Sequence, residues 1–243
     1  MRVLVVTLVK KEPPGQHWYG AHLYGRSLVG AFRLEWDGQL DYLFLVGGDQ
    51  LYEGEHARST AYLNIARKYE QARRHALAMG YDAILQVESD MIVPPDALKK
   101  LASVTDAGVV YGLYVWRHGS AQWSAYSEVK YSTGTSLSAD PERARESWGK
   151  VIDVAGVGDG CTLIWRDTLE RIERWTDEVG HVSCDWMMSL DCQELGITQK
   201  AHLGVVCGHL TEKPSPRILW PDPEQEKLYR IEFLDWPLEE EVE

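Results

Sequence analysis

The chain has 243 residues, of which 44% are hydrophobic, and its formal net charge is −12. This length and apolar content suffice for one α/β domain with a buried core, so a disordered chain is excluded. The acidic charge argues against broad, sequence-independent binding to DNA or RNA, which needs a basic surface. A local basic groove stays open as an alternative.

The N-terminal segment MRVLVVTLVKKE has an apolar stretch of about nine residues, followed by Lys10 and Lys11. It is too short for a membrane span and lacks the order of charged, apolar and small residues that marks a signal peptide. We therefore expect a cytoplasmic protein without a membrane span.

The cysteine and aromatic content further limits the kinds of protein that the chain can be. The four cysteines include no CxxC pair, so we expect buried free thiols rather than a zinc ribbon or a disulfide framework. Ten Trp and twelve Tyr stand against three Phe. Such side chains suit a core edge, an interface, or the apolar face of a sugar or base.

Apolar runs alternate with helical patterns along the chain, which predicts a doubly wound α/β sheet that binds ligands at the carboxyl ends of its strands. Strands are predicted at Met1–Val9, Tyr42–Val46, Ala83–Val87, Val109–Val115 and Gln199–Cys207, with further regular structure at Val151–Val157 and Thr162–Trp165. Helices are predicted at His22–Phe32, Thr60–Met79, 94–103, Asp167–Trp175 and within His181–Gly196.

Two regions differ from this pattern. Residues 117–150 are rich in Ser, Gly, Thr and Trp and carry the charged insert PERARES, which indicates a mobile functional loop or an edge hairpin. From Lys213 the chain holds five prolines and ends in EEEVE, so we expect a tail that wraps the surface and frays. The predicted organisation is one catalytic domain over 1–212 and a Pro-rich acidic tail over 213–243.

Two carboxylates stand at the end of a predicted strand, in ILQVESDMIVPPDAL. Residues two apart on an extended segment point the same way, so Glu88 and Asp90 could face one ion. Hard divalent cations prefer oxygen ligands, and one or two carboxylates leave room for water and phosphate oxygens. The alternative is a strand that merely emerges into solvent.

Two later residues have chemistry that fits such a site. Asp185, in SCDWMMSLDCQELGI, falls at the first turn or N-cap of a helix, where a capping aspartate is the alternative. His209 follows an apolar strand in VVCGHLT, and a hydrogen-bonded surface histidine is the alternative there. Imidazole ligates Mn2+ beside carboxylates, so two acids and a histidine form a coherent ligand set.

Four segments together resemble the GT-A glycosyltransferases, particularly the family-two-like enzymes of bacteria and phages. They are ARKYEQARRHALAMGYDAILQVESDMIVPPDALKKL, GVGDGCTLIWRDTLERI, CDWMMSLDCQELGI and CGH, in that order, and the likeness runs from Val3 to about Leu210. It implies a GT-A-like, mostly parallel sheet flanked by helices. It also implies a nucleotide-diphosphate sugar as donor and Mn2+ or Mg2+ as cofactor.

The resemblance also implies roles for matching positions. The metal ligands would be Asp90, His209 and Glu88. The donor-binding residues would be Thr7, Asp49, Arg67, Glu88, Ser89 and Asp90, although a plain turn is the alternative at Asp49. Asp185 matches the second acid of a Glu-Asp pair and would be the catalytic base. Three positions depart from the family pattern: Glu88 stands where Asp is usual, Lys68 where Asn is usual, and Cys184 where Glu is usual.

Candidate acceptor-binding residues lie in or beside the irregular middle segment, in the segment GVGDGC, and directly after Asp185. They are Trp116, Trp123, Gly160 and Trp186, with Trp148 also flanking the loop. The indoles could stack on an acceptor, and hydrophobic anchoring of the loop is the alternative. The glycines could let backbone approach a ligand or could simply form a tight turn.

The predicted function is a metal-dependent glycosyltransferase, inverting if Asp185 acts as base on an acceptor hydroxyl that attacks from the face opposite the diphosphate. Phage relatives suggest a modified DNA base as one acceptor, which predicts a basic groove around Arg117, Lys130, Arg143 and Arg145. A nucleotidyltransferase acting on a sugar phosphate is one alternative, although VKKEPPGQHWYG does not resemble its Gly-rich phosphate loop. A non-catalytic, lectin-like sugar-binding protein is the other.

Overall fold

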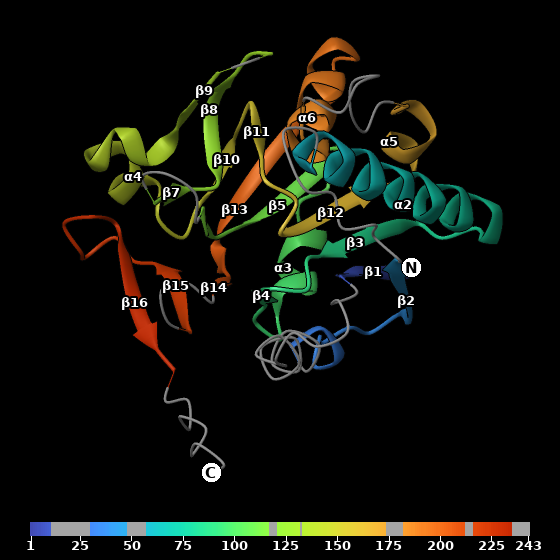
Figure 1. Ribbon diagram of the computed structural model, residues 1–243, viewed down its shortest axis with the longest axis horizontal. Helices are drawn as coiled ribbons and strands as arrows, with labels where there is room; N and C mark the ends of the chain where they lie inside the picture. Colours follow the sequence, from blue (N-terminus) through green and yellow to red (C-terminus); the bar gives the residue numbers. More distant parts are fainter. Residues whose placement is uncertain are drawn as a thin grey trace.

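The computed structural model describes residues 1–10, 30–47, 57–116, 121–131, 133–173, 182–211 and 216–234. Its centre is a sheet with the strand order β10-β13-β5-β12-β3-β1-β2 (Figure 1). These strands are β1 (Arg2–Lys10), β2 (Gln39–Gly47), β3 (Ala83–Val87), β5 (Val109–Leu113), β10 (Val151–Asp153), β12 (Cys161–Trp165) and β13 (Gln199–Val206).

The sheet is mostly parallel, as predicted. β1 pairs in parallel with both β2 and β3, and β5 pairs in parallel with β13. β12 lies between β3 and β5 and is antiparallel to both, while β10 is antiparallel to β13 at the edge. The carboxyl ends of β1, β3, β5 and β13 therefore meet at one edge of the sheet, where open α/β sheets bind ligands.

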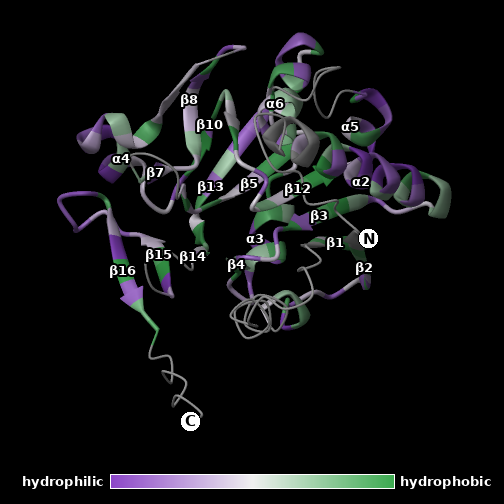
Figure 2. Cartoon of the chain, viewed as in Figure 1, coloured by the Kyte–Doolittle hydropathy of each residue, from purple (hydrophilic) through white to green (hydrophobic). Residues whose placement is uncertain are grey.

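Helices cover both faces of the sheet because alternate strand residues point to opposite sides. Leu4, Val6 and Ile84 join one core with residues of α2 (Ala57–Met79), α5 (Arg166–Arg171) and α6 (Cys184–Glu194). Val5 and Leu85 join the other core with α3 (Ala97–Ala102). Figure 2 shows the apolar colouring concentrated along these inner strands.

Helix α2 forms where the apolar period predicts it. Ala66, Tyr69, Ala72 and Ala76 are buried and make the stripe that packs on the sheet. The helix ends at Gly80, whose φ of +73° is the left-handed conformation that favours glycine after a helix. The helix predicted at His22–Phe32 lies mostly outside the described residues.

The middle segment is an arrangement of short strands rather than a loop. β8 (Ala125–Val129) pairs with β9 (Gly134–Ser136) and with β11 (Gly156–Val157), and β6 (Val115–Trp116) pairs with β7 (Gln122–Trp123). PERARES forms α4 (Pro141–Ser147), capped by the Asp140 carboxylate, which accepts from the backbone N–H of Arg143. The edge-hairpin alternative is confirmed for the described part of this region.

The expectation of a fraying tail is wrong for residues 216–234. There β15 (Arg217–Pro221) and β16 (Tyr229–Phe233) extend a small sheet that also contains β14 (Gly208–Thr211) and β4 (Met91–Ile92) (Figure 1). Ile218 and Leu219 are buried in it, and this burial outweighs the local proline content.

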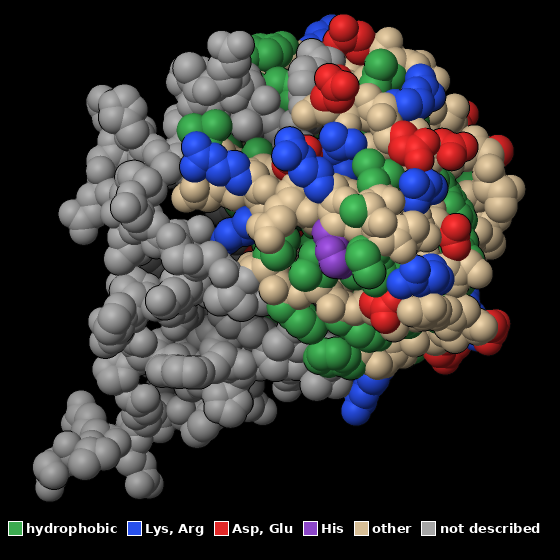
Figure 3. Space-filling view, turned by 90° about the vertical axis from the view of Figure 1, so that its right-hand side faces the viewer, with side chains coloured by type: hydrophobic (Ala, Val, Ile, Leu, Met, Phe, Trp, Pro, Cys, Tyr) green, Lys and Arg blue, Asp and Glu red, His purple; other side chains and the backbone are tan. Residues whose placement is uncertain are grey.

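The described surface carries mixed charge. On the face in Figure 3, basic and acidic side chains are interspersed rather than gathered into one patch. The four cysteines are free and buried, as expected. In the part of the chain that the structure describes, no helix has both the length and the apolar character that a bilayer span needs.

Candidate functional site

Asp90 and His209 meet at the carboxyl edge of the central sheet. Asp90 follows β3, His209 lies in β14, and the backbone N–H of Leu210 donates to the Asp90 carbonyl at 2.8 Å. The His209 Nε2 atom lies 3.5 Å from Asp90 Oδ2. His209 is 5% exposed, so this pair is held in place by surrounding protein.

The hydrogen bond of the His209 Nδ1 atom fixes the orientation of the ring toward Asp90. Nδ1 lies 2.7 Å from the Val115 carbonyl oxygen, which can only accept a hydrogen bond, so Nδ1 carries the hydrogen. With Nδ1 engaged in this way, Nε2 is the ring nitrogen that faces the Asp90 carboxylate. A histidine whose other nitrogen is oriented by a backbone carbonyl is typical of metal ligands.

Glu88 and Asp90 stand on a turn, contrary to the expectation of an extended segment. The Met91 N–H donates to the Glu88 carbonyl at 3.0 Å, which closes a turn with Ser89 and Asp90 at its centre. The turn sends the two carboxylates to different neighbours. Asp90 faces His209, whereas Glu88 belongs to a second cluster of acids.

The second cluster, here called the acid cluster, consists of Glu88, Asp159 and Asp185. Burial raises the pKa of Asp159 well above its usual range, and the charges of Asp185 and Glu88 raise it further. The same three charges also raise the pKa of the buried hydroxyl of Tyr114, after the larger effect of burial. Tyr114 lies edge-on to His209, with ring centroids 5.3 Å apart, and so connects the acid cluster with the Asp90–His209 pair.

Asp185 sits in the first turn of α6, as predicted, but it is not the N-cap, which is Ser183. Its Oδ1 accepts from the Trp186 backbone N–H at 2.8 Å. Although the residue is partly exposed, the protein around its carboxyl raises the pKa of Asp185; hydrogen bonds from Ser183 and Trp186 act in the opposite direction. A carboxyl with a raised pKa at the end of a site is suited to accept a proton.

Sequence reasoning missed Asp159, the most buried member of the acid cluster. The prediction for GVGDGC concerned only its glycines and assigned no role to Asp159. A charged residue between two glycines and directly before a buried strand was the available signal. Its neighbours come from α2 and α6, which no local pattern reveals.

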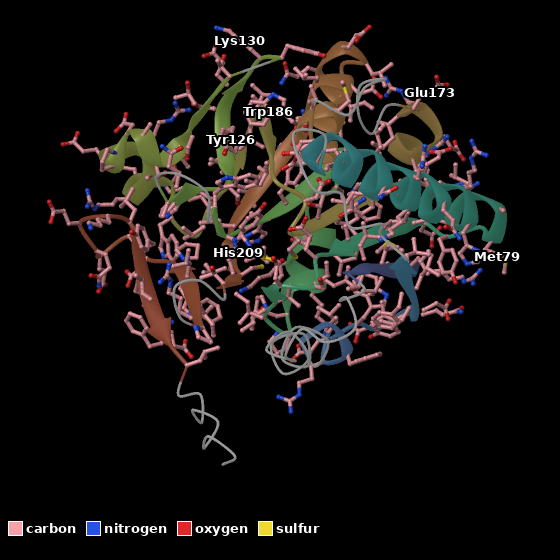
Figure 4. The ribbon with its side chains drawn as sticks, viewed as in Figure 1. Met79, Tyr126, Lys130, Glu173, Trp186 and His209 are labelled. Atoms are coloured by element: carbon pink, nitrogen blue, oxygen red, sulfur yellow. The ribbon has the colours of Figure 1, made fainter. Side chains whose placement is uncertain are left out.

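The candidate acceptor residues separate into buried and partly exposed groups. Trp123 is 1% exposed and its indole N–H donates to the Leu228 carbonyl at 2.7 Å, so stacking on an acceptor is wrong for it. Trp116 is partly exposed at the end of β6. Trp186 is also partly exposed; its N–H donates to Lys130 O at 2.6 Å and its ring packs edge-on to Tyr126 (Figure 4).

Gly160 is explained by close packing. A Cβ built there would lie 2.7 Å from the Tyr114 ring and 2.9 Å from Met91. Its carbonyl accepts the Glu88 N–H at 3.1 Å. The glycine therefore lets the loop before β12 lie against the turn after β3.

The remaining donor-binding candidates lie around this edge. Thr7 is buried on β1, and its hydroxyl has no hydrogen-bond partner among the described residues. Arg67 is exposed on α2, two residues before Tyr69, which faces the acid cluster. Ser89 lies in the turn, and Asp49 lies outside the described residues.

The residues proposed for a basic groove are largely engaged elsewhere. Lys130 pairs with Glu128 at 2.6 Å, and the Arg145 guanidinium donates to the Pro223 carbonyl at 2.9 Å. Arg143 is exposed on α4, and Arg117 lies outside the described residues.

A divalent cation fits the Asp90–His209 pair as a two-ligand site. Over the described ranges no three His, Cys, Asp or Glu side chains converge enough to hold an ion by themselves. Cations such as Mn2+ and Mg2+ commonly combine one or two protein ligands with phosphate oxygens and water. The pair therefore offers two ligands of the kind that such cations take.

Three solved structures are similar to this one. The crystal structure of A197 from STIV has a TM-score of 0.57 and 17% identity, over 97% of this chain and 95% of that one. GalNAc-T7 with UDP, GalNAc and Mn2+ has a TM-score of 0.54 and 12% identity, over 85% of this chain and 43% of that one. The inositol-1-phosphate CTP transferase from T. maritima has a TM-score of 0.50 and 9% identity, over 82% and 84%.

At these identities the likeness shows the fold alone. The chain has a mixed α/β fold of the GT-A and nucleotidyltransferase kind, which two of these transferases share. No family model matches the sequence, and no curated protein sequence matches it.

Proposed function

We propose that the protein is a divalent-metal-dependent glycosyltransferase that moves a sugar from a nucleotide-diphosphate sugar to an acceptor hydroxyl. The observation that carries the proposal is the Asp90–His209 pair, with Nε2 3.5 Å from Oδ2 and Nδ1 committed to a backbone carbonyl. The shared fold with GalNAc-T7, which was solved with UDP, GalNAc and Mn2+, supports the same class of donor.

In this proposal Asp90 and His209 hold Mn2+ or Mg2+, and the donor diphosphate and water supply the other ligands. A bound cation would stabilise the negative charge that grows on the departing diphosphate. Glu88, Ser89, Arg67 and Thr7 are assigned to the donor side.

Asp185 is assigned as the general base. The acceptor oxygen forms a bond to the anomeric carbon, the bond from that carbon to the diphosphate breaks with its electron pair, and Asp185 takes the acceptor proton. Attack from the face opposite the diphosphate inverts the anomeric centre. Trp116 and Trp186 are the partly exposed aromatic residues left for the acceptor side.

A nucleotidyltransferase that joins a nucleotide to a sugar phosphate is the second candidate, because the CTP transferase from T. maritima shares the fold over most of both chains. The two candidates differ in their products. Glycosyl transfer releases a nucleoside diphosphate, whereas nucleotidyl transfer consumes a nucleoside triphosphate and releases pyrophosphate.

Thermal unfolding with and without Mn2+ tests the proposal. The probes are UDP, UDP-GalNAc, UDP-glucose and GDP-mannose, with CTP for the rival reaction. We expect a nucleotide sugar to stabilise the protein only with Mn2+, by about 2.7 kcal/mol at a hundredfold excess over its Kd. Asp90→Asn and His209→Gln should abolish this stabilisation, while Asp153→Asn, on an exposed strand, should retain it.

Product analysis then separates the two reactions. Release of UDP or GDP from the stabilising donor supports glycosyl transfer, and pyrophosphate release from CTP supports the rival. If no nucleotide sugar stabilises the protein with Mn2+, the glycosyltransferase proposal is wrong. Stabilisation that persists in Asp90→Asn would instead show that the metal site is misplaced.

A further inference from the structure

Asp159 is a carboxyl group buried in the protein. It is 1% exposed, and among the described residues no N–H or O–H group donates to either of its side-chain oxygens. Burying a polar group without a hydrogen bond costs folding free energy, so native proteins satisfy nearly all such groups. An acid left in this state implies that something outside the described chain completes its hydrogen bonds.

The loop that carries Asp159 is held in one position by close packing. A Cβ at Gly158 would overlap the Tyr114 hydroxyl, and a Cβ at Gly160 would press on Tyr114 and Met91. Both flanking positions therefore exclude a side chain. Asp159 is the one side chain that the loop can present between them.

The surroundings of Asp159 show where its carboxyl points. The charge of Asp159 raises the pKa of buried Tyr69 on α2 and of buried Cys184 on α6, in each case after the effect of burial. The carboxyl therefore lies on the α2 and α6 side of the sheet, near Asp185 and Glu88. The adjacent thiol of Cys184 is a weak hydrogen-bond donor, and its bond to the carboxyl is the smallest of the effects on the pKa of Asp159.

Asp159 interacts with residues of both the proposed metal site and the proposed catalytic base. The charge of Asp159 interacts with that of Glu88, two residues from the proposed metal ligand Asp90, and with that of Asp185, the proposed base. A donor whose diphosphate lies at Asp90 and whose anomeric carbon faces Asp185 places its sugar between these groups.

We propose that Asp159 is a sugar-binding residue whose carboxyl oxygens hydrogen-bond to hydroxyl groups of the transferred sugar. This inference rests on the proposed function and adds a residue to its donor site. Phosphate is an unsuitable occupant because Glu88 and Asp185 would repel it. A metal ion does not fit either, because the acid cluster does not converge on one ion in the described structure. Sugar hydroxyls are neutral donors and match a group that needs hydrogen bonds.

The experiment compares Asp159→Asn, Asp159→Ala and the exposed control Asp153→Asn. Calorimetric titrations with Mn2+ measure the affinity for UDP, which lacks the sugar, and for the nucleotide sugar that stabilises the wild type. We expect Asp159→Ala to weaken nucleotide-sugar binding by about tenfold to hundredfold and to leave UDP binding within about twofold. Asp159→Asn keeps the shape and one acceptor oxygen, so its loss should be smaller.

Thermal unfolding without ligand separates a binding role for Asp159 from a structural one, because the two roles predict opposite changes in the unfolding midpoint of Asp159→Asn. Replacing an unpaired buried carboxyl with a neutral amide should leave the unfolding midpoint of Asp159→Asn unchanged or higher. A lower midpoint together with unchanged nucleotide-sugar affinity would assign Asp159 to the fold and overturn the inference. Asp159→Asn is isosteric, so the test does not depend on Asp159→Ala folding.

The failures of the two proposals are distinguishable. If wild type binds UDP and a nucleotide sugar with Mn2+, and both Asp159 variants bind them equally well, only the role of Asp159 is wrong. If wild type binds no nucleotide sugar in the panel, the proposed function and the inference that depends on it are both wrong. An equal loss of UDP and nucleotide-sugar binding in Asp159→Asn would also exclude sugar recognition.

Discussion

Replacing Trp123 should damage the fold rather than acceptor binding. The indole is 1% exposed, lies 5.6 Å from the Trp148 ring, and donates to the Leu228 carbonyl at 2.7 Å. Trp123→Phe removes this donor and leaves the Leu228 carbonyl with the Asp222 N–H at 2.9 Å, so the lost hydrogen bond should cost about 0.5–1.5 kcal/mol. Trp123→Ala adds a cavity, for a total of about 3–5 kcal/mol.

Urea unfolding followed by far-ultraviolet circular dichroism measures both free energies. Leu228 precedes β16, so the lost hydrogen bond should also loosen the β15–β16 hairpin and speed its cleavage in limited proteolysis. Trp116→Phe is the contrasting variant, because Trp116 is partly exposed and Phe keeps an aromatic face. A Trp123→Phe protein with unchanged unfolding free energy and a selective loss of acceptor binding would refute this reasoning.

Two further predictions concern pH. Burial raises the pKa of Asp185 above 3.8, so a transfer rate that needs the ionised carboxylate should fall with decreasing pH at a value above 3.8. A pH–rate profile locates this limb, and Asp185→Asn should lower the rate by about a hundredfold or more; an unchanged rate in that variant would remove Asp185 from the mechanism. Burial, and then the charge of Lys100, lower the pKa of His202 below 6.5, and its Nδ1 accepts the Gly204 N–H at 3.2 Å. The unfolded chain therefore binds this proton more tightly, so the stability from neutral His202 is present above pH 6.5 and is lost as pH falls through the lowered folded value. Unfolding free energies at pH 7.5 and pH 5.5 should differ less in His202→Asn than in wild type, and an equal difference in the two proteins would contradict this assignment.

The central sheet could be predicted because its strands carry their burial in local sequence. Ala83–Val87 is uniformly apolar apart from Gln86, and the observed β3 has the predicted bounds. Helix α6 ends before Gly196, whose φ of +64° matches the predicted stop. These features depend on periodicity and on backbone conformations that only particular residues adopt.

The acid cluster could not be predicted in the same way. Glu88 and Asp90 were expected on extended backbone, but a turn follows β3. Asp159 reaches the site because β12 is inserted between β3 and β5, a pairing that no local pattern encodes. The C-terminal strands were hidden by prolines, although RILWP and YRIEF contain the apolar residues that their sheet uses.

The contact between Cys184 and Asp159 bears on how relatives of this chain should be sought. The resemblance to GT-A enzymes leads one to expect a glutamate at position 184, and a comparison by alignment column records its replacement by cysteine as the loss of an acid. In space, the Cys184 thiol lies beside a carboxyl that comes from the loop before β12. A carboxyl from a different segment of the chain therefore lies near Asp185 although position 184 carries a thiol. Searches that require acids at fixed spatial positions, rather than at fixed sequence positions, would retain proteins of this kind that motif searches discard.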